Sequence, residues 1–120
     1  MKEHMRTFDF TSRWGDKYEI AFAKTRYVSG NNLAVEVACR EDGEEWWEPY
    51  GMLTVNIGWT FGERQAYLDT NNVPDLVEFV MSNGWAKEIG EGHSGFCTYP
   101  MVEFTEEFVN EVCVAEEEWV

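Results

Sequence analysis

Positive charge is scarce in this sequence: nine Lys and Arg stand against 23 Asp and Glu, a formal net charge of −14 over 120 residues. Phosphate contacts depend on Lys and Arg, so direct binding to nucleic acid or to an anionic membrane surface is disfavoured. Repulsion on this scale works against a compact state, which indicates that the charge serves a partner. A basic protein surface is its natural complement.

The chain also lacks long apolar runs and paired cysteines. No stretch reaches the roughly 20 apolar residues that cross a bilayer, and the N-terminal MKEHMRTFDF lacks a signal-peptide core. The three cysteines, Cys39, Cys97 and Cys113, are widely spaced, with no Cys-x-x-Cys pair for zinc or redox exchange. We therefore expect a cytoplasmic protein with reduced thiols.

Aromatic residues, in contrast, are plentiful at 16% of the chain, and apolar residues make up 44%. Disordered chains are poor in aromatics, so this composition predicts a folded protein despite its charge. The length fits one domain, residues 1–120, with an acidic C-terminal segment at 105–120.

The first half of the sequence reads as strands. Apolar residues alternate over 18–24 and 33–39 on either side of the turn at 29–32, which predicts an antiparallel hairpin. Asp42-Gly43 predicts a second tight turn, followed by strands at 52–57 and 66–68.

The second half begins with a predicted helix. Asn71 or Asn72 would be its N-cap, Pro74 lies in its first turn, and Asn83-Gly84 ends it. We then expect a flexible glycine-containing loop at 90–95, a strand at 96–104 and a short helix capped by Thr105. The predicted fold class is α+β, a mostly antiparallel β-sheet of about five to six strands with one or two helices packed on it.

No recognisable catalytic or metal-binding motif occurs. The sequence lacks HExxH, a phosphate-binding glycine loop and a nucleophile elbow, and the acidic run at 41–48 lacks the order of an EF-hand. We predict no catalytic residues, no metal and no cofactor, and we expect the protein not to be an enzyme.

The sequence contains two weaker candidate sites. His93 and Cys97 are close in sequence, but Cys97 falls in an apolar strand of an acidic region, so we predict a core thiol. Residues 69–72, Asp-Thr-Asn-Asn, favour helix capping and turn formation. A small-ligand or cation site formed by residues 69–72 and 93–99 stays open as an alternative.

Two acidic clusters give the strongest signal. The first has Glu41, Asp42, Glu44, Glu45 and Glu48 around Trp46 and Trp47, and the second has seven glutamates between Glu103 and Glu118, followed by Trp119. Solvated surfaces usually explain such runs, but no Lys or Arg lies within either one, and tryptophan is enriched at interface hot spots. The predicted partner-binding residues are Glu44, Glu45, Trp46, Trp47, Glu48, Glu107, Glu111, Glu117 and Trp119.

Three segments carry a family resemblance: LTVN at 53–56, AYLDTNN at 66–72 with Pro74 and Glu78-Phe79, and SGFCTYP at 94–100 with Glu103-Phe104. They resemble the domain-of-unknown-function 4313 family, small proteins of bacterial mobile elements. The match covers roughly residues 50–104, and the acidic tail departs from it. The resemblance transfers no catalytic residue, but it implies a context in which small acidic proteins often counter host defence.

Charge and resemblance together lead to one functional hypothesis. We expect a non-enzymatic inhibitor of the anti-CRISPR or anti-restriction type that occludes the basic nucleic-acid-binding surface of a nuclease. The alternatives are a structural or adaptor module of a conjugative element with no inhibitory role, and a small-ligand-binding domain.

Overall fold

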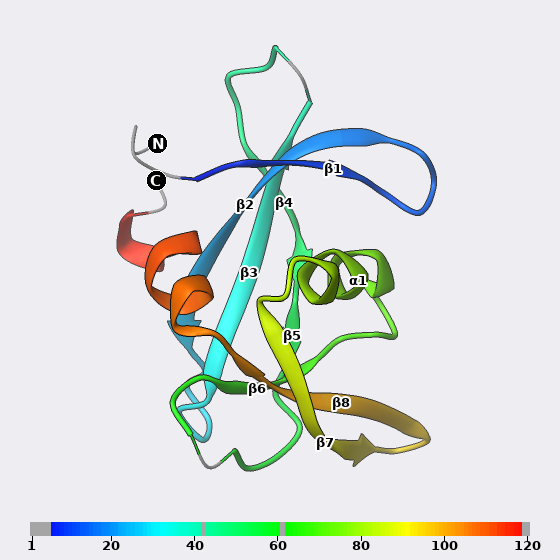
Figure 1. Cartoon of the computed structure of the whole chain (residues 1–120), viewed down its shortest axis with the longest axis vertical. Helices are drawn as coiled ribbons and strands as arrows, with labels where there is room; N and C mark the ends of the chain where they lie inside the picture. The colour runs from blue at the N-terminus through cyan, green and yellow to red at the C-terminus, as the bar shows by residue number, and fades with distance from the viewer. Residues whose placement is uncertain (1–5, 42, 61, 119–120) are drawn as a thin grey trace.

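The structure is a computed structural model that describes residues 6–41, 43–60 and 62–118 (Figure 1). Within them, nine strands form two sheets, which confirms the α+β class but exceeds the expected strand number. The first sheet contains β1 Phe8–Thr11, β2 Lys17–Arg26, β3 Leu33–Arg40, β4 Glu48–Met52 and β9 Cys113–Ala115. The second contains β5 Thr54–Val55, β6 Gln65–Leu68, β7 Ala86–Ser94 and β8 Cys97–Phe104. The helical elements are α1 Pro74–Ser82, the π-helix Phe108–Val112 and a 3₁₀ turn Glu116–Glu118.

The predicted hairpin of β2 and β3 is confirmed and forms the centre of the first sheet. Phe22 pairs with Val37 in its antiparallel register. The side chains of a strand alternate between its two faces. Phe22 and Val37 therefore face the main core, whereas Ala21 and Ala23 face the other side of the sheet.

The C-terminal part of the chain returns to this sheet. After the π-helix, β9 pairs in parallel with β2, placing Cys113 opposite Phe22, while β1 pairs with the preceding part of the same edge. Thr105 caps the helical segment as predicted, because its Oγ1 accepts a hydrogen bond from the Phe108 N–H at 3.0 Å. The acidic tail is therefore anchored by a strand.

The strand predicted at 52–57 is interrupted at Leu53, where the chain passes from the first sheet to the second. The Leu53 N–H donates to the Val35 carbonyl at 2.9 Å, and the Leu53 carbonyl accepts from the Asp69 N–H at 2.9 Å. Leu53 is fully buried. Its backbone groups thus join the two sheets, which an uninterrupted strand in one sheet would not do.

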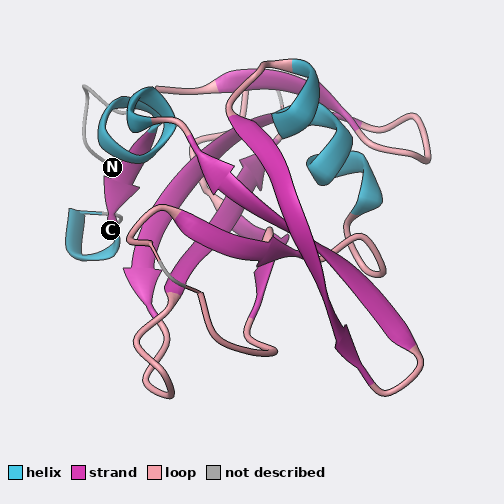
Figure 2. Cartoon of the chain, turned by 60° about the horizontal axis from the view of Figure 1, so that its bottom comes forward, coloured by secondary structure: helices cyan, strands magenta, loops and turns pink. Residues whose placement is uncertain are grey.

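The loop predicted at 90–95 is wrong: most of it belongs to β7, whose hairpin with β8 extends from the body of the molecule (Figures 1 and 2). Gly95, at φ +61°, forms the turn. A Cβ on Gly92 would lie 2.5 Å from Cε1 of Tyr67, so glycine here permits close packing of the hairpin. Glycine within a strand can mark close approach as well as flexibility.

Helix α1 and a cluster of aromatic rings complete the core. The N-cap of α1 is Val73, which makes no side-chain capping bond, so the predicted capping by Asn71 or Asn72 is wrong. The Asp69 carboxylate holds this turn instead, accepting from the backbone N–H of Asn72 at 3.0 Å and from its Nδ2 at 2.9 Å. Phe108 is fully buried, with its ring centroid 4.7 Å from Phe104 and 5.3 Å from Phe22.

Candidate protein-interaction surface

The tip of the β3–β4 hairpin carries the first acidic cluster. Gly43 takes a left-handed φ of +86°, and the Glu44 N–H donates to the Glu41 carbonyl at 3.1 Å. The side chains of Glu41, Glu44 and Glu45 are exposed, and Trp46 is 79% exposed. Among the residues that the structure describes, no Lys or Arg forms an ion pair with these glutamates or with Glu48. Asp42 lies outside the described residues.

Trp47 fixes this tip to the sheet. Its half-buried ring packs against the small cluster of Ala21, Ala23 and Val114 on the outer side of the first sheet. The Arg40 guanidinium lies 4.6 Å from the ring centroid, and Arg40 is itself paired with Glu19 at 2.5 Å. Of the two adjacent tryptophans, Trp46 therefore offers the free ring, and Trp47 positions it.

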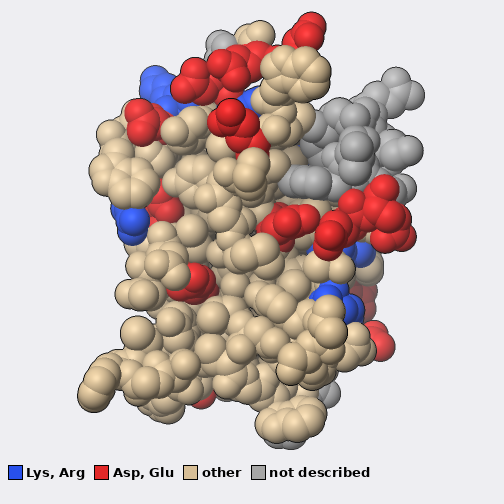
Figure 3. All heavy atoms as spheres, turned by 180° about the vertical axis from the view of Figure 1, so that it is seen from behind, with Lys and Arg blue, Asp and Glu red and all other residues tan. Residues whose placement is uncertain are grey.

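Strand β9 brings the C-terminal acids to the same side. The 3₁₀ turn Glu116–Glu118 lies against β2, the partner strand of β3. Burial raises the pKa of the Glu36 carboxyl on β3, and the charge of Glu116 raises it further. Glu36, Trp47 and Glu48 line one shallow groove of about 240 Å³. Figure 3 shows acidic groups gathered towards the top and one side of the face in view, and a lower part with few charges. We define the acidic face as Glu36, Glu44, Glu45, Trp46, Trp47, Glu48, Glu116 and Glu117.

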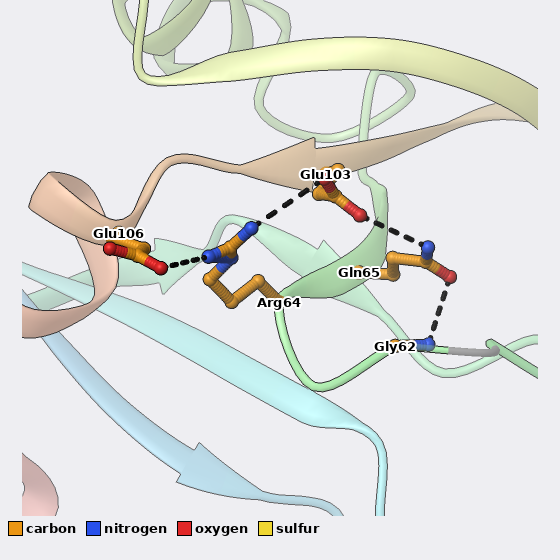
Figure 4. Close-up of polar contacts among 5 residues, drawn as sticks. All are labelled: Gly62, Arg64, Gln65, Glu103 and Glu106. Carbon is orange, nitrogen blue, oxygen red and sulfur yellow. Dashed lines mark hydrogen bonds and ion pairs between the residues drawn. The ribbon is translucent and has the colours of Figure 1, made fainter.

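The sequence led us to expect no cation near the second cluster, but the structure places Arg64 beside it. Arg64 comes from the loop before β6 and places its guanidinium 3.6 Å from Glu103 and 3.3 Å from Glu106 (Figure 4). Those two glutamates are therefore partly neutralised. Glu107, Glu111 and Glu117 are exposed, and no ion pair to them occurs within the described ranges. Trp119 lies outside the residues that the structure describes.

A Cys–His dyad is not formed. His93 and Thr98 are cross-strand neighbours, with His93 Nδ1 3.0 Å from Thr98 Oγ1. Cys97 immediately precedes Thr98 in β8, so its side chain points to the opposite face. Cys97 is only half-buried and lies outside the main core cluster, so the predicted core position is wrong; Cys39 and Cys113 are the buried thiols.

The other candidate ligand residues are engaged in structure. The Asp69 side chain is buried, and both of its oxygens accept bonds within the turn before α1. Within the described residues, no group of three or more His, Cys, Asp or Glu is placed to hold a metal ion. None of the described helices is long and apolar enough to cross a membrane.

Comparison with known proteins identifies the family and leaves the activity open. No curated protein and no solved structure shows significant similarity to the chain. Residues 22–120 match a family described as a domain of unknown function, DUF4313. This match extends through the acidic tail, beyond the segments that carried the resemblance in sequence, and the chain belongs to the DUF4313 family.

Proposed function

We propose that this protein is a non-enzymatic, cytoplasmic inhibitor from a mobile genetic element that binds the basic nucleic-acid-binding surface of a CRISPR or restriction nuclease. The observation that supports it most strongly is the acidic face. Its carboxylates come from β3, the β3–β4 hairpin and the chain after β9, and no described Lys or Arg pairs with them. Such a face complements a groove that normally holds phosphates.

The mechanism is occlusion. Glutamates of the acidic face, together with Glu107 and Glu111, would occupy the Lys and Arg side chains that otherwise contact phosphate. Trp46, 79% exposed at the hairpin tip, would supply the apolar anchor. Charge complementarity gives fast association that weakens with salt, because exposed charges more than roughly 10 Å apart are largely screened at 0.1 M salt.

Competition binding tests the proposal. The protein is titrated against a panel of purified CRISPR and restriction nucleases, with and without their DNA or guide RNA, at low and high salt. We expect binding to at least one nuclease, exclusion of its nucleic acid and loss of affinity as salt rises. Binding to a nuclease that leaves nucleic-acid loading and cleavage unchanged would instead favour an adaptor role in a conjugative element.

A matched pair of variants separates the acidic face from charge in general. The triple variant Glu44→Lys, Glu45→Lys and Glu48→Lys should abolish binding, because the tip would then repel a basic groove. The control triple, Glu78→Lys, Glu88→Lys and Glu91→Lys, changes the net charge by the same amount at exposed positions on α1 and β7. Equal losses in both triples would reject the acidic face as the binding site.

A further inference from the structure

A separate concavity gathers the chain's scarce cations. It encloses about 650 Å³ between β2, the loop before β6 and the π-helix, and it shares no residue with the acidic face. Ligand pockets commonly enclose about 300–1,000 Å³. Lys24, Arg26 and Arg64 all line it, out of nine Lys and Arg in the whole chain.

One wall of this pocket is fixed by an ion-pair network. Arg64 is held between Glu103 and Glu106, and Gln65 Nε2 donates to Glu103 at 3.2 Å (Figure 4). The same Gln65 side chain accepts a bond from the Gly62 N–H at 3.1 Å through Oε1. The charge of Arg64 is thus balanced by two carboxylates of the protein itself, and these contacts hold this wall of the pocket in place.

The opposite wall carries two cations, Lys24 and Arg26, that are bonded to backbone carbonyls and not to carboxylates. Lys24 donates from Nζ to the Val109 carbonyl, and Arg26 donates from a terminal guanidinium nitrogen to the Glu63 carbonyl at 3.1 Å. No ion pair joins either cation to a carboxylate in the parts of the chain that the structure describes. A carbonyl is a neutral partner, so both charges remain available to an anion.

The strand and the helix set the positions of these two cations. Lys24 and Arg26 are two residues apart on β2, so they lie on the same face, roughly 7 Å apart along the strand. Val109 is in a π-helix, a rare element that occurs frequently at functional sites. An ammonium has three donors, so the bond from Lys24 to Val109 leaves others for a ligand.

We propose that this pocket binds a small phosphate monoester that carries an apolar group. The phosphate lies between Lys24 and Arg26, which act as a point charge and a planar fork of donors. The apolar group packs against Leu33, Val109 and Ala115 of the lining. Glu103 and Glu106 also line the pocket, where both are paired with Arg64, and Glu63 lines it at an exposed position.

Phenyl phosphate is the probe that tests this proposal. Backbone amide shifts in two-dimensional NMR should move at residues 24–26, 62–64 and 109–110 and saturate in the millimolar range or below. Phenol and inorganic phosphate should each bind more weakly, because each supplies only half of the contacts. Absence of saturable shifts, or equal binding of phenol, would overturn the proposal.

Substitutions assign the binding to the two cations. Arg26→Gln, at an exposed position, should weaken phenyl phosphate binding about tenfold or more, the usual cost of losing a bond to a charged group. Lys24→Met should do the same in protein that retains the native NMR spectrum. The controls Arg13→Gln and Lys87→Met, exposed cations outside the pocket, should leave binding unchanged. Equal weakening in the controls would reduce the effect to general electrostatics and reject the site.

Discussion

The two acidic clusters look alike in sequence but differ in the structure. The hairpin cluster has no paired cation among its described glutamates, and its tip is held by the packing of Trp47. In the C-terminal cluster, Arg64 pairs with Glu103 and Glu106, and the chain is fixed through Phe108 and β9. Neutralisation depends on which distant loop the fold brings close, so charge counted along the sequence overstates the free charge of the second cluster.

The largest expected effect comes from removing Phe108, the buried ring that anchors the C-terminal cluster. Phe108→Ala should lower the free energy of unfolding by about 3–5 kcal/mol, because a fully buried ring contacting Phe22, Phe104 and Trp85 is lost. Urea denaturation measures this loss. The control Phe96→Ala removes a ring with a relative exposure of 110% and should change stability by less than about 0.5 kcal/mol. Equal stabilities of the two variants would contradict the described core.

The second-largest effect comes from a variant that leaves the C-terminal cluster, like the hairpin cluster, without a paired cation. Arg64→Gln removes the paired charge from Glu103 and Glu106 and should lower stability by about 1 kcal/mol, since both pairs are partly exposed. The loss should shrink in high salt, which screens the repulsion that remains. Urea denaturation of wild type and variant at two salt concentrations checks both points. A loss that does not respond to salt would assign Arg64 a packing role instead.

The third effect tests whether the two clusters meet at β3. Burial first, and then Glu116, raise the pKa of Glu36 above its ordinary value. A raised carboxyl pKa means that the folded state binds the proton more tightly than the unfolded state does. The ionised Glu36 carboxylate therefore lowers stability at neutral pH, and this cost disappears as the pH falls through the folded pKa. Glu116→Gln should lower the Glu36 pKa, measured by carbon-detected NMR titration. An unchanged Glu36 pKa would show that Glu116 does not act on Glu36, and that the two clusters do not meet at β3.

The smallest effects concern the thiols. Cys97 is half-buried on the projecting hairpin, so Cys97→Ala should cost less stability than Cys113→Ala. Burial raises the pKa of Cys113 to about 12, and burial also raises the pKa of Cys39. A disulfide reagent should therefore modify Cys97 before the other two, because the thiolate is the reactive form. Faster modification of Cys113 would contradict its burial.

Sequence reasoning succeeded where one face of an element is apolar. The alternation in β2 and β3 located the central hairpin, and Thr105 located the helical segment that follows β8. It failed at β7 because glycines, read as signs of flexibility, instead permit the approach of Tyr67 at Gly92. It also missed the break at Leu53, since an apolar run does not reveal that its backbone bonds go to two sheets.

The candidate surface was predictable only in part. The exposed hairpin tip with Trp46 could be located from the Asp-Gly turn and its flanking acids. The position of Glu116 beside the first sheet could not, because it depends on a three-residue parallel strand with no periodic signal of its own. The pairing of Arg64 with Glu103 and Glu106 likewise arises from tertiary contacts between separated segments.

The parallel pairing of β9 with β2 has a consequence for synthesis on the ribosome. One edge of β2 is shared: β1 covers residues 17–20, and β9 covers residues 22–24. Residues 22–24 therefore keep an open backbone edge until residues 113–115 have emerged. Pairing between segments so distant in sequence is slow to form, and unpaired edges favour aggregation. During translation, the open edge of β2 would be a natural point of chaperone engagement, and β9, which follows the other described strands in the chain, would complete the first sheet.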